Sequence, residues 1–217
     1  MEKVRYYPVF LDLRNRHCIV IGGGKVAERK IRSLIEAEAT VTVISPDLTE
    51  EIERLCRSGR IRHISRSYQK GDLKDAFLVI AATSDKDVNR EIFEEASGKP
   101  LNVVDMPDLC TFIVPSVIRR GNLTVAISTS GVSPALSRSL RLDLQDCIPE
   151  EIGEFLDFLG ALRRRIKGRE GSEEILKEVG SQRILRTLVL SGVEEAKEEV
   201  KRILAERGLE GLVDGYL

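Results

Sequence analysis

Apolar and polar positions follow two alternating patterns along the first half of the chain. Short runs of apolar, often β-branched residues recur, and the segments between them carry apolar residues at helical spacing. Runs that are apolar on both faces are typical of a parallel sheet covered by helices on two sides. The pattern predicts strands at Cys18–Ile21, Thr40–Ile44, Ile61–Ile64, Phe77–Ala81 and Leu101–Val104. It predicts helices near Val26–Ala37, Thr49–Ser58 and Val88–Ala96. Right-handed crossovers then give an α/β fold, a Rossmann-like doubly wound parallel sheet with ligands at the carboxyl ends of its strands.

The next part of the chain has the pattern of a hairpin followed by a helix. Two further strands are predicted at Phe112–Val117 and Leu123–Ser128, joined by a turn at Arg119–Asn122 with hairpin composition. Ser133 followed by Pro134 is typical of a helix N-cap and a first-turn proline.

Helical spacing of apolar residues continues to the end of the chain. The helix after Ser133 carries an apolar stripe at Leu136, Leu140, Leu144 and Ile148, and Pro149 opens another helix. The charged segment Arg163–Gly171 is interpreted as a linker or a surface turn. Last helices are predicted near Ile175–Leu190 and Glu194–Arg207, the second with a capping box of Ser191 and Glu194. These stripes either cover the chain's own sheet or pack against a second subunit; elements appended beyond a complete nucleotide fold favour a dimer.

Composition excludes several classes of function. The 217 residues suffice for one α/β domain and an extension, and 34 basic against 35 acidic residues give a net charge of −1. That balance supplies no overall field to attract nucleic acid or an anionic membrane. No apolar run approaches the roughly 20 residues of a membrane span, and the first residues lack a signal peptide, so we expect a cytoplasmic protein. The four cysteines are scattered, and neither disulfides nor a metal site are expected.

A glycine-rich turn follows the first predicted strand. Gly22, Gly24 and Ala27 fit the dinucleotide-binding fingerprint. Gly22 permits the tight turn, Gly24 lets the backbone approach a pyrophosphate, and Ala27 allows close packing of helix on strand. The free N–H groups of the helix start then face the phosphates. The alternative is a glycine-rich turn without a ligand.

Asp47 follows the second predicted strand, where an acid of this fold meets the ribose hydroxyls of NAD. Asp47 and Glu50 also have the spacing of a capping box, and the two roles are compatible. No arginine directly follows the strand to hold a 2′-phosphate, which favours NAD over NADP. Thr83 follows the fourth strand among small residues and is a candidate cofactor contact; the alternative is a helix N-cap at Ser84 or Asp85.

Asp105 lies where the fifth predicted strand leaves the sheet, on the side where ligands bind. A carboxylate there can accept a proton or orient a substrate N–H, and partial burial would favour proton uptake. The alternative is an Asx-turn before Met106 and Pro107. The hydroxyl-rich segment Ser128–Pro134 and nearby arginines can meet anionic groups, or simply start a helix and face solvent.

Together these motifs resemble the precorrin-2 dehydrogenases, the dehydrogenase and ferrochelatase modules of sirohaem synthesis. The resemblance covers about residues 6–167. It rests on motifs in matching order and spacing: Tyr7–Phe10, Val20–Lys30, Ala81–Thr83 with Val88 and Asn89, Asn102–Asp105, Phe112–Ser116, and Ser133 with Pro134. One glycine of the family's loop before Ser133 is missing, and the chain ends at Leu217, so a methyltransferase would be a separate protein.

The resemblance implies oxidation of precorrin-2 to sirohydrochlorin with NAD as cofactor, and in some members insertion of ferrous iron to give sirohaem. By position it assigns cofactor contacts to Lys25, Val26, Pro46 and Asp47, and the family's essential aspartate, a general base, to Asp105. The substrate is a tetrapyrrole with eight carboxylates.

The candidate substrate contacts are Ser128, Thr129 and Arg138. The resemblance also implies a homodimer. Together with the apolar pattern, it predicts an NAD-binding Rossmann domain at 1–114, a dimerisation region at 115–150 and a helical C-terminal domain at 151–217. The competing hypotheses are an NAD(H)-sensing regulatory Rossmann module without tetrapyrrole turnover, and a tetrapyrrole carrier without catalysis.

Overall fold

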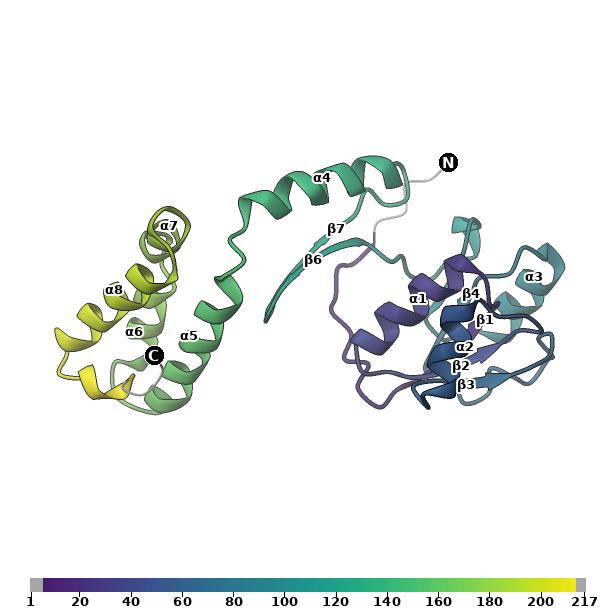
Figure 1. Ribbon diagram of the computed structural model, residues 1–217, viewed down its shortest axis with the longest axis horizontal. Coiled ribbons are helices and arrows are strands. Elements are labelled where there is room, and N and C mark those ends of the chain that lie inside the picture. Colours follow the sequence, from purple (N-terminus) through teal and green to yellow (C-terminus); the bar gives the residue numbers. More distant parts are fainter. Residues whose placement is uncertain (1–5, 214–217) are drawn as a thin grey trace. The chain divides into compact units, whose positions relative to one another are not determined.

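The computed structural model describes residues 6–213 and divides into two units, which are treated separately (Figure 1). The first unit ends at Val114 and the second begins at Pro115. No helix among the described residues is long and apolar enough to cross a membrane.

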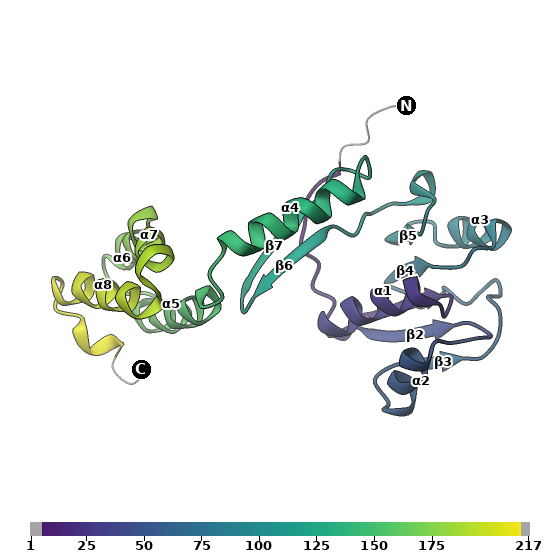
Figure 2. The same ribbon diagram turned by 45° about the horizontal axis from the view of Figure 1, so that its top comes forward.

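The first unit is a parallel sheet of five strands with helices on both faces (Figures 1 and 2). Its strands are β1 (His17–Ile21), β2 (Thr40–Ile44), β3 (Arg62–Ile64), β4 (Leu78–Ala81) and β5 (Leu101–Val103). Its helices are α1 (Lys25–Glu36), α2 (Glu50–Arg57) and α3 (Lys86–Glu95). The strand order β3-β2-β1-β4-β5 reverses between β1 and β4, which makes a topological switch point at the carboxyl ends of those two strands. The predicted doubly wound fold is therefore confirmed.

Alternate residues of the central strands pack into two separate cores. Cys18 and Val20 of β1 face the core shared with Ile31 of α1 and Ile52 of α2. The intervening Ile19 and Ile21 face the core on the other side, which α3 covers with Ile92. This is why Cys18–Ile21 of β1 and all of β4 are apolar on both faces, as a sheet covered on two sides requires.

As far as residue 213, the second unit consists of an antiparallel hairpin, five α-helices and a short 3-10 helix at Glu210–Leu212. The hairpin pairs β6 (Ser116–Arg120) with β7 (Leu123–Ile127). The helices are α4 (Pro134–Cys147), α5 (Ile152–Ile166), α6 (Ser172–Val179), α7 (Gln182–Ser191) and α8 (Val193–Ala205). Helix α4 packs on the hairpin, and α5 to α8 enclose a core that includes Leu162, Leu188 and Val200. Ser133 caps α4 as predicted, because its Oγ accepts the Leu136 N–H at 3.2 Å.

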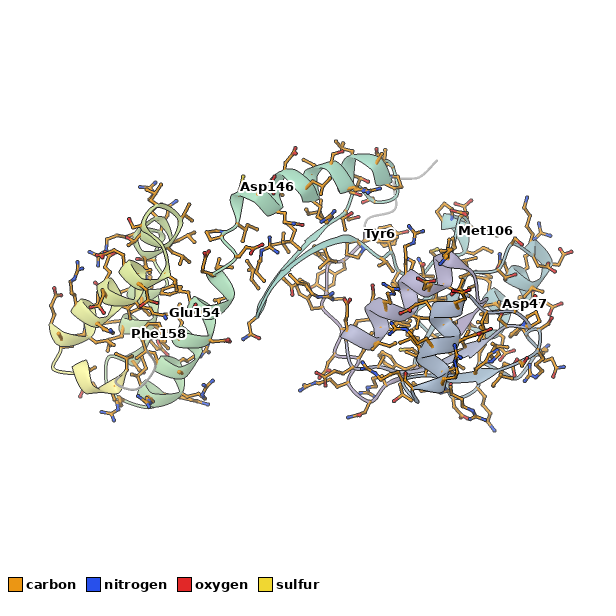
Figure 3. The ribbon with its side chains drawn as sticks, in the orientation of Figure 1. Tyr6, Asp47, Met106, Asp146, Glu154 and Phe158 are labelled. Carbon is orange, nitrogen blue, oxygen red and sulfur yellow. The ribbon has the colours of Figure 1, made fainter. Side chains whose placement is uncertain are left out.

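The helical part also contains a buried lysine. The side chain of Lys197 in α8 is only 6% exposed and donates to Glu154 at 2.5 Å and Glu194 at 2.9 Å. These hydrogen bonds raise the pKa of Lys197, mainly through Glu154 of α5 (labelled in Figure 3), so the buried ammonium stays charged. The ion pair joins α8 to α5.

One predicted strand and one predicted turn of the hairpin region are placed differently. The predicted strand Phe112–Val117 is wrong in position, because the backbone N–H of Phe112 bonds to Leu101 beside β5 and only Ser116 onward pairs in the hairpin. The predicted turn at Arg119–Asn122 is shorter, because both arginines pair within the hairpin and Gly121 and Asn122 alone make the turn.

Three predictions for the helical end are also wrong. The single helix Ile175–Leu190 is divided at Gly180 and Ser181, residues that favour a helix end and a helix start respectively. The capping box of Ser191 and Glu194 is not formed, because Ser191 ends α7 and Gly192 precedes α8. The predicted linker or surface turn at Arg163–Gly171 is wrong only in its first part: α5 continues to Ile166, whose side chain is fully buried, and Lys167–Gly171 form a turn.

The tip of the hairpin lies against the start of α5. Gly121 has a φ of +53°, and a Cβ on it would lie 2.8 Å from the Cα of Gly153. Beside this contact, Asn122 Nδ2 donates to Asp157 Oδ1 at 2.6 Å. Backbone therefore packs directly on backbone, which only two glycines allow.

We expect Gly153→Ala to lower the free energy of unfolding by about 1–3 kcal/mol, because its Cβ would lie 3.0 Å from the Gly121 nitrogen. Gly160 of the same helix is the matched control, since its added Cβ would meet only the flexible end of Arg164 at 3.7 Å. Gly160→Ala should raise stability by about 0.5–1 kcal/mol. Urea unfolding followed by circular dichroism compares the two, and equal stabilities would contradict the packing account.

Candidate functional site

The turn between β1 and α1 leaves no room for side chains on its first two glycines. Gly22 has a φ of +108°, so the predicted tight turn is present, and its N–H donates to Ile44 O at 2.9 Å. A Cβ on Gly22 would lie 2.4 Å from Ala82 O, after β4. A Cβ on Gly23 would lie 2.0 Å from Asp47 O, after β2. The glycine turn is thus closely packed between the loop after β2 and the loop after β4.

The third glycine differs, because a Cβ on Gly24 would meet nothing within 4 Å. Gly24 is the N-cap residue of α1, and no side chain caps that end of the helix. Lys25 and Val26 form the first turn, with the Lys25 side chain 82% exposed. Free backbone N–H groups and open space therefore meet at the start of a twelve-residue helix, the arrangement that binds phosphate.

The loop after β2 presents Pro46 and Asp47 to solvent, and Figure 3 labels Asp47. The predicted capping box of Asp47 and Glu50 is wrong. Thr49 is the N-cap residue of α2, and its Oγ1 accepts the Ile52 N–H at 3.4 Å. Among the described residues the Asp47 carboxylate has no hydrogen-bond or ion-pair partner, so it is free to accept hydroxyl groups of a ligand.

Glu28 is a charged residue of this region that the sequence analysis did not single out. It is only 8% exposed and accepts hydrogen bonds from Thr49 Oγ1 at 2.9 Å and Lys25 Nζ at 3.2 Å. Arg32 Nη2 lies 3.2 Å from its other oxygen. The hydrogen bond from Thr49 holds the pKa of Glu28 below its ordinary value, and the hydrogen bond from Lys25 adds to this effect.

Glu28 thereby ties the first turn of α1 to the start of α2. The spacing of Glu28 to Lys25 and Arg32 indicates helix-surface pairs. No local signal reveals Thr49, because 21 positions separate it from Glu28.

The loop after β4 contains Thr83, whose Oγ1 accepts the Asp85 N–H at 3.2 Å. Asp85 caps α3 by accepting the N–H groups of Asp87 and Val88, so the proposed N-cap at this position is confirmed for Asp85. The Thr83 carbonyl accepts Nδ2 of Asn89 at 3.2 Å. Thr83 lies at the carboxyl end of β4, next to the residue that contacts the glycine turn.

Asp105 follows β5 with a φ of +60°, a left-handed conformation that aspartate tolerates better than most residues. Asp105 is exposed, so its carboxylate lies at the surface of the unit and is not partly buried. The proposed Asx-turn is not formed either, since its carboxylate has no hydrogen-bond partner among the described residues. A backbone bond from Met106 N–H to Val103 O closes the turn instead.

The predicted cofactor residues and Asp105 therefore all lie at the carboxyl ends of strands in one sheet. The candidate substrate residues belong to the second unit. There Thr129 Oγ1 accepts a hydrogen bond from the Ser133 N–H at 3.1 Å, and Ser128 Oγ accepts one from the Ser130 N–H at 2.9 Å. These bonds support the alternative that the segment Ser128–Pro134 starts a helix. Arg138 is exposed on α4. The described residues contain no group of three metal-ligating acids, cysteines or histidines.

Comparison with known proteins gives matches along most of the chain. Residues 9–116 match the family described as putative NAD(P)-binding, and residues 120–146 match the family described as sirohaem biosynthesis protein central. A sirohaem synthase of Methylobacillus flagellatus is 42% identical over 207 residues, which are 93% of this chain and 44% of the relative. A sirohaem synthase of Nitrosomonas europaea is 44% identical over 167 residues, 76% of this chain and 35% of the relative.

The chain thus spans less than half the length of these relatives. Among solved structures, the precorrin-2 dehydrogenase SirC matches with a TM-score of 0.76 and 27% identity, over 91% of this chain and 100% of SirC. The first unit is therefore a nicotinamide-dinucleotide-binding domain, and the motifs of the sequence occur in the fold that their resemblance implies.

Glu28 makes a testable contribution to the pH dependence of stability. Its pKa is lower in the folded chain than in the unfolded chain, so the ionised group stabilises the fold above the ordinary value of 4.5 and this gain is lost as pH falls through the folded pKa. Wild type should exceed Glu28→Gln in unfolding free energy at pH 7, and the difference should shrink below pH 4.5. Glu53→Gln, an exposed site on α2, is the control. A difference independent of pH would contradict this role of Glu28.

Proposed function

We propose that the chain is a precorrin-2 dehydrogenase module of the kind found in sirohaem synthases, and that it oxidises precorrin-2 to sirohydrochlorin with NAD⁺ as hydride acceptor. One observation carries the proposal. A helix start without side chains at Gly24 and an unpaired carboxylate at Asp105 lie at the carboxyl ends of strands in the same sheet. The helix start can bind the phosphates of a dinucleotide, and the carboxylate can accept a proton.

The residues of the glycine turn fit a dinucleotide. The pyrophosphate would lie against Gly24 and the N–H groups of Lys25 and Val26, with the exposed Lys25 ammonium adding positive charge. Pro46 and Asp47 would bound the ribose, and the Asp47 carboxylate would accept its hydroxyls. A free carboxylate there would repel a 2′-phosphate, which supports NAD rather than NADP. Thr83 would contact the cofactor from the β4 side of the switch point.

Oxidation of precorrin-2 removes a hydride and a proton. Bound NAD⁺ supplies the acceptor for the hydride. Asp105 accepts the proton, because its carboxylate is free of hydrogen bonds and projects from a turn rather than from a helix or strand. Arg138, Ser128 and Thr129 are proposed to meet the carboxylates of the tetrapyrrole. Insertion of ferrous iron stays a prediction from the resemblance, since no contact of the described residues bears on it.

We also propose that the chain forms a homodimer through α4. The apolar stripe of this helix is not covered by the hairpin on which it packs: Leu136, Leu140 and Leu144 are 53%, 39% and 42% exposed. Unpartnered leucines at helical spacing are typical of a surface that another protein covers. The alternative of an NAD(H)-sensing module explains the glycine turn and this stripe, but turnover of precorrin-2 separates it from the dehydrogenase.

Replacing Asp105 tests the assignment of the base. Asp105→Asn keeps the shape and the tolerance for a positive φ, and it should lower kcat for precorrin-2 oxidation at least about a hundredfold. Asp105→Ala should do the same, with NAD⁺ affinity and folding nearly unchanged in both. Asp108→Asn, an exposed acid in the next turn, is the control and should keep normal turnover. Normal turnover by the Asp105 variants would refute the assignment.

Valine substitutions separate the roles of the glycines. Gly24→Val is expected to fold normally and to weaken NAD⁺ binding at least about tenfold, because its side chain would occupy the space next to the pyrophosphate. Gly22→Val is also expected to weaken binding, but its side chain would collide with Ala82 O and strain the backbone, so it confounds binding with folding. Titration calorimetry measures the affinities. An unchanged dissociation constant for Gly24→Val would exclude the pyrophosphate site.

A further inference from the structure

Asn89 lies inside the first unit, between the loop after β4 and the loop after β5. Its side chain is 2% exposed and comes from the first half of α3. The amide nitrogen Nδ2 donates to Thr83 O at 3.2 Å and lies 3.7 Å from Met106 Sδ. Met106, labelled in Figure 3, directly follows Asp105. One amide group therefore contacts both loops that carry candidate site residues.

Packing alone does not account for an asparagine at this position. Asparagine is unfavourable within a helix, because its side chain competes for backbone hydrogen bonds. The other amide atom, Oδ1, is buried without a hydrogen-bond partner among the described residues. A buried acceptor without a donor is unfavourable, and an apolar side chain of similar size would avoid it. The contacts of Nδ2 are the favourable interactions that the amide makes here.

Both loops are joined to the rest of the site. The loop after β4 reaches the glycine turn, because Ala82 O is the nearest atom to a Cβ built on Gly22. The loop after β5 is tied to the end of β4 by the bond from Val104 N–H to Ala81 O at 2.9 Å. Asp105 itself has the strained φ of +60°, so its backbone depends on its neighbours for its conformation.

We propose that Asn89 is a positioning residue for the reaction: its amide sets the spacing between the loop at Thr83 and the turn that presents Asp105. The proposal rests on the dehydrogenase function proposed above. Asn89 is buried, so its role is indirect. It acts through Thr83 and Met106, so that the carboxylate of Asp105 keeps its place relative to the bound cofactor.

Asn89→Leu removes the amide at similar volume and tests the proposal kinetically. We expect kcat for precorrin-2 oxidation to fall between about tenfold and a hundredfold, with the KM for precorrin-2 and the dissociation constant of NAD⁺ within about threefold of wild type. Tyr68→Phe is the control, because it removes another hydrogen bond of this unit, to Glu95 at 2.5 Å, that involves no residue of either loop. Its kcat should stay within about twofold of wild type. Asn89→Ala replaces the leucine variant if that fails to fold.

Hydrogen exchange provides a measurement that needs no substrate. In the full chain, the amides of residues 82–84 and 104–106 should both exchange faster in the Asn89 variant than in wild type, and not in Tyr68→Phe. An unchanged rate in either loop, or a wild-type kcat in the Asn89 variant, would overturn the proposal. If wild type itself failed to oxidise precorrin-2, the dehydrogenase function would fall. The exchange rates would then still decide whether Asn89 couples the loops.

Discussion

The carboxyl edge of the sheet depends on one steric constraint, the absence of side chains from the turn between β1 and α1. Because Gly23 has no Cβ, the backbone oxygen of Asp47, in the loop after β2, can pack against it. Because Gly22 has no Cβ, the backbone oxygen of Ala82, in the loop after β4, can pack against it. The two loops that flank the switch point can then close on the start of α1. The hydrogen bond between Thr49 and Glu28 holds the loop after β2 against α1. The hydrogen bond between Asn89 and Thr83 holds the loop after β4 against α3. What remains open is the space at Gly24, where the helix presents its unpaired N–H groups.

This arrangement separates binding from chemistry within the first unit. The groups proposed to hold the dinucleotide are backbone N–H groups and exposed side chains next to β1, β2 and β4, whereas Asp105 comes from the turn after β5. The carboxylates also differ in their surroundings. Glu28 is paired and its pKa is lowered by Thr49 and Lys25, so it serves structure, while Asp47 and Asp105 are exposed and unpaired among the described residues. A free carboxylate is what ribose binding and proton transfer each require.

Much of this fold is predictable because its strands are short apolar runs with a clear period. Strand β2 has the predicted limits, and the glycine fingerprint marks the turn in which Gly22 takes its positive φ. Contacts between residues distant in the sequence cannot be predicted in this way. The packing of Gly23 on Asp47 and the hydrogen bond of Thr49 to Glu28 produce no recognisable spacing of residues in the sequence. The helical end shows the opposite limit. An apolar period continues across Gly180, so the pattern predicts one helix where the chain makes two that share a core.

The central claim is that these residues form a dehydrogenase site and not only a dinucleotide-binding site. The most direct measurement is anaerobic absorbance of the purified chain with freshly generated precorrin-2 and NAD⁺. The account predicts that the sirohydrochlorin spectrum grows with an equal amount of NADH, and that neither forms without the protein. Binding of NAD⁺ without any change in the spectrum of intact precorrin-2 would contradict the account and favour a sensing or carrier role.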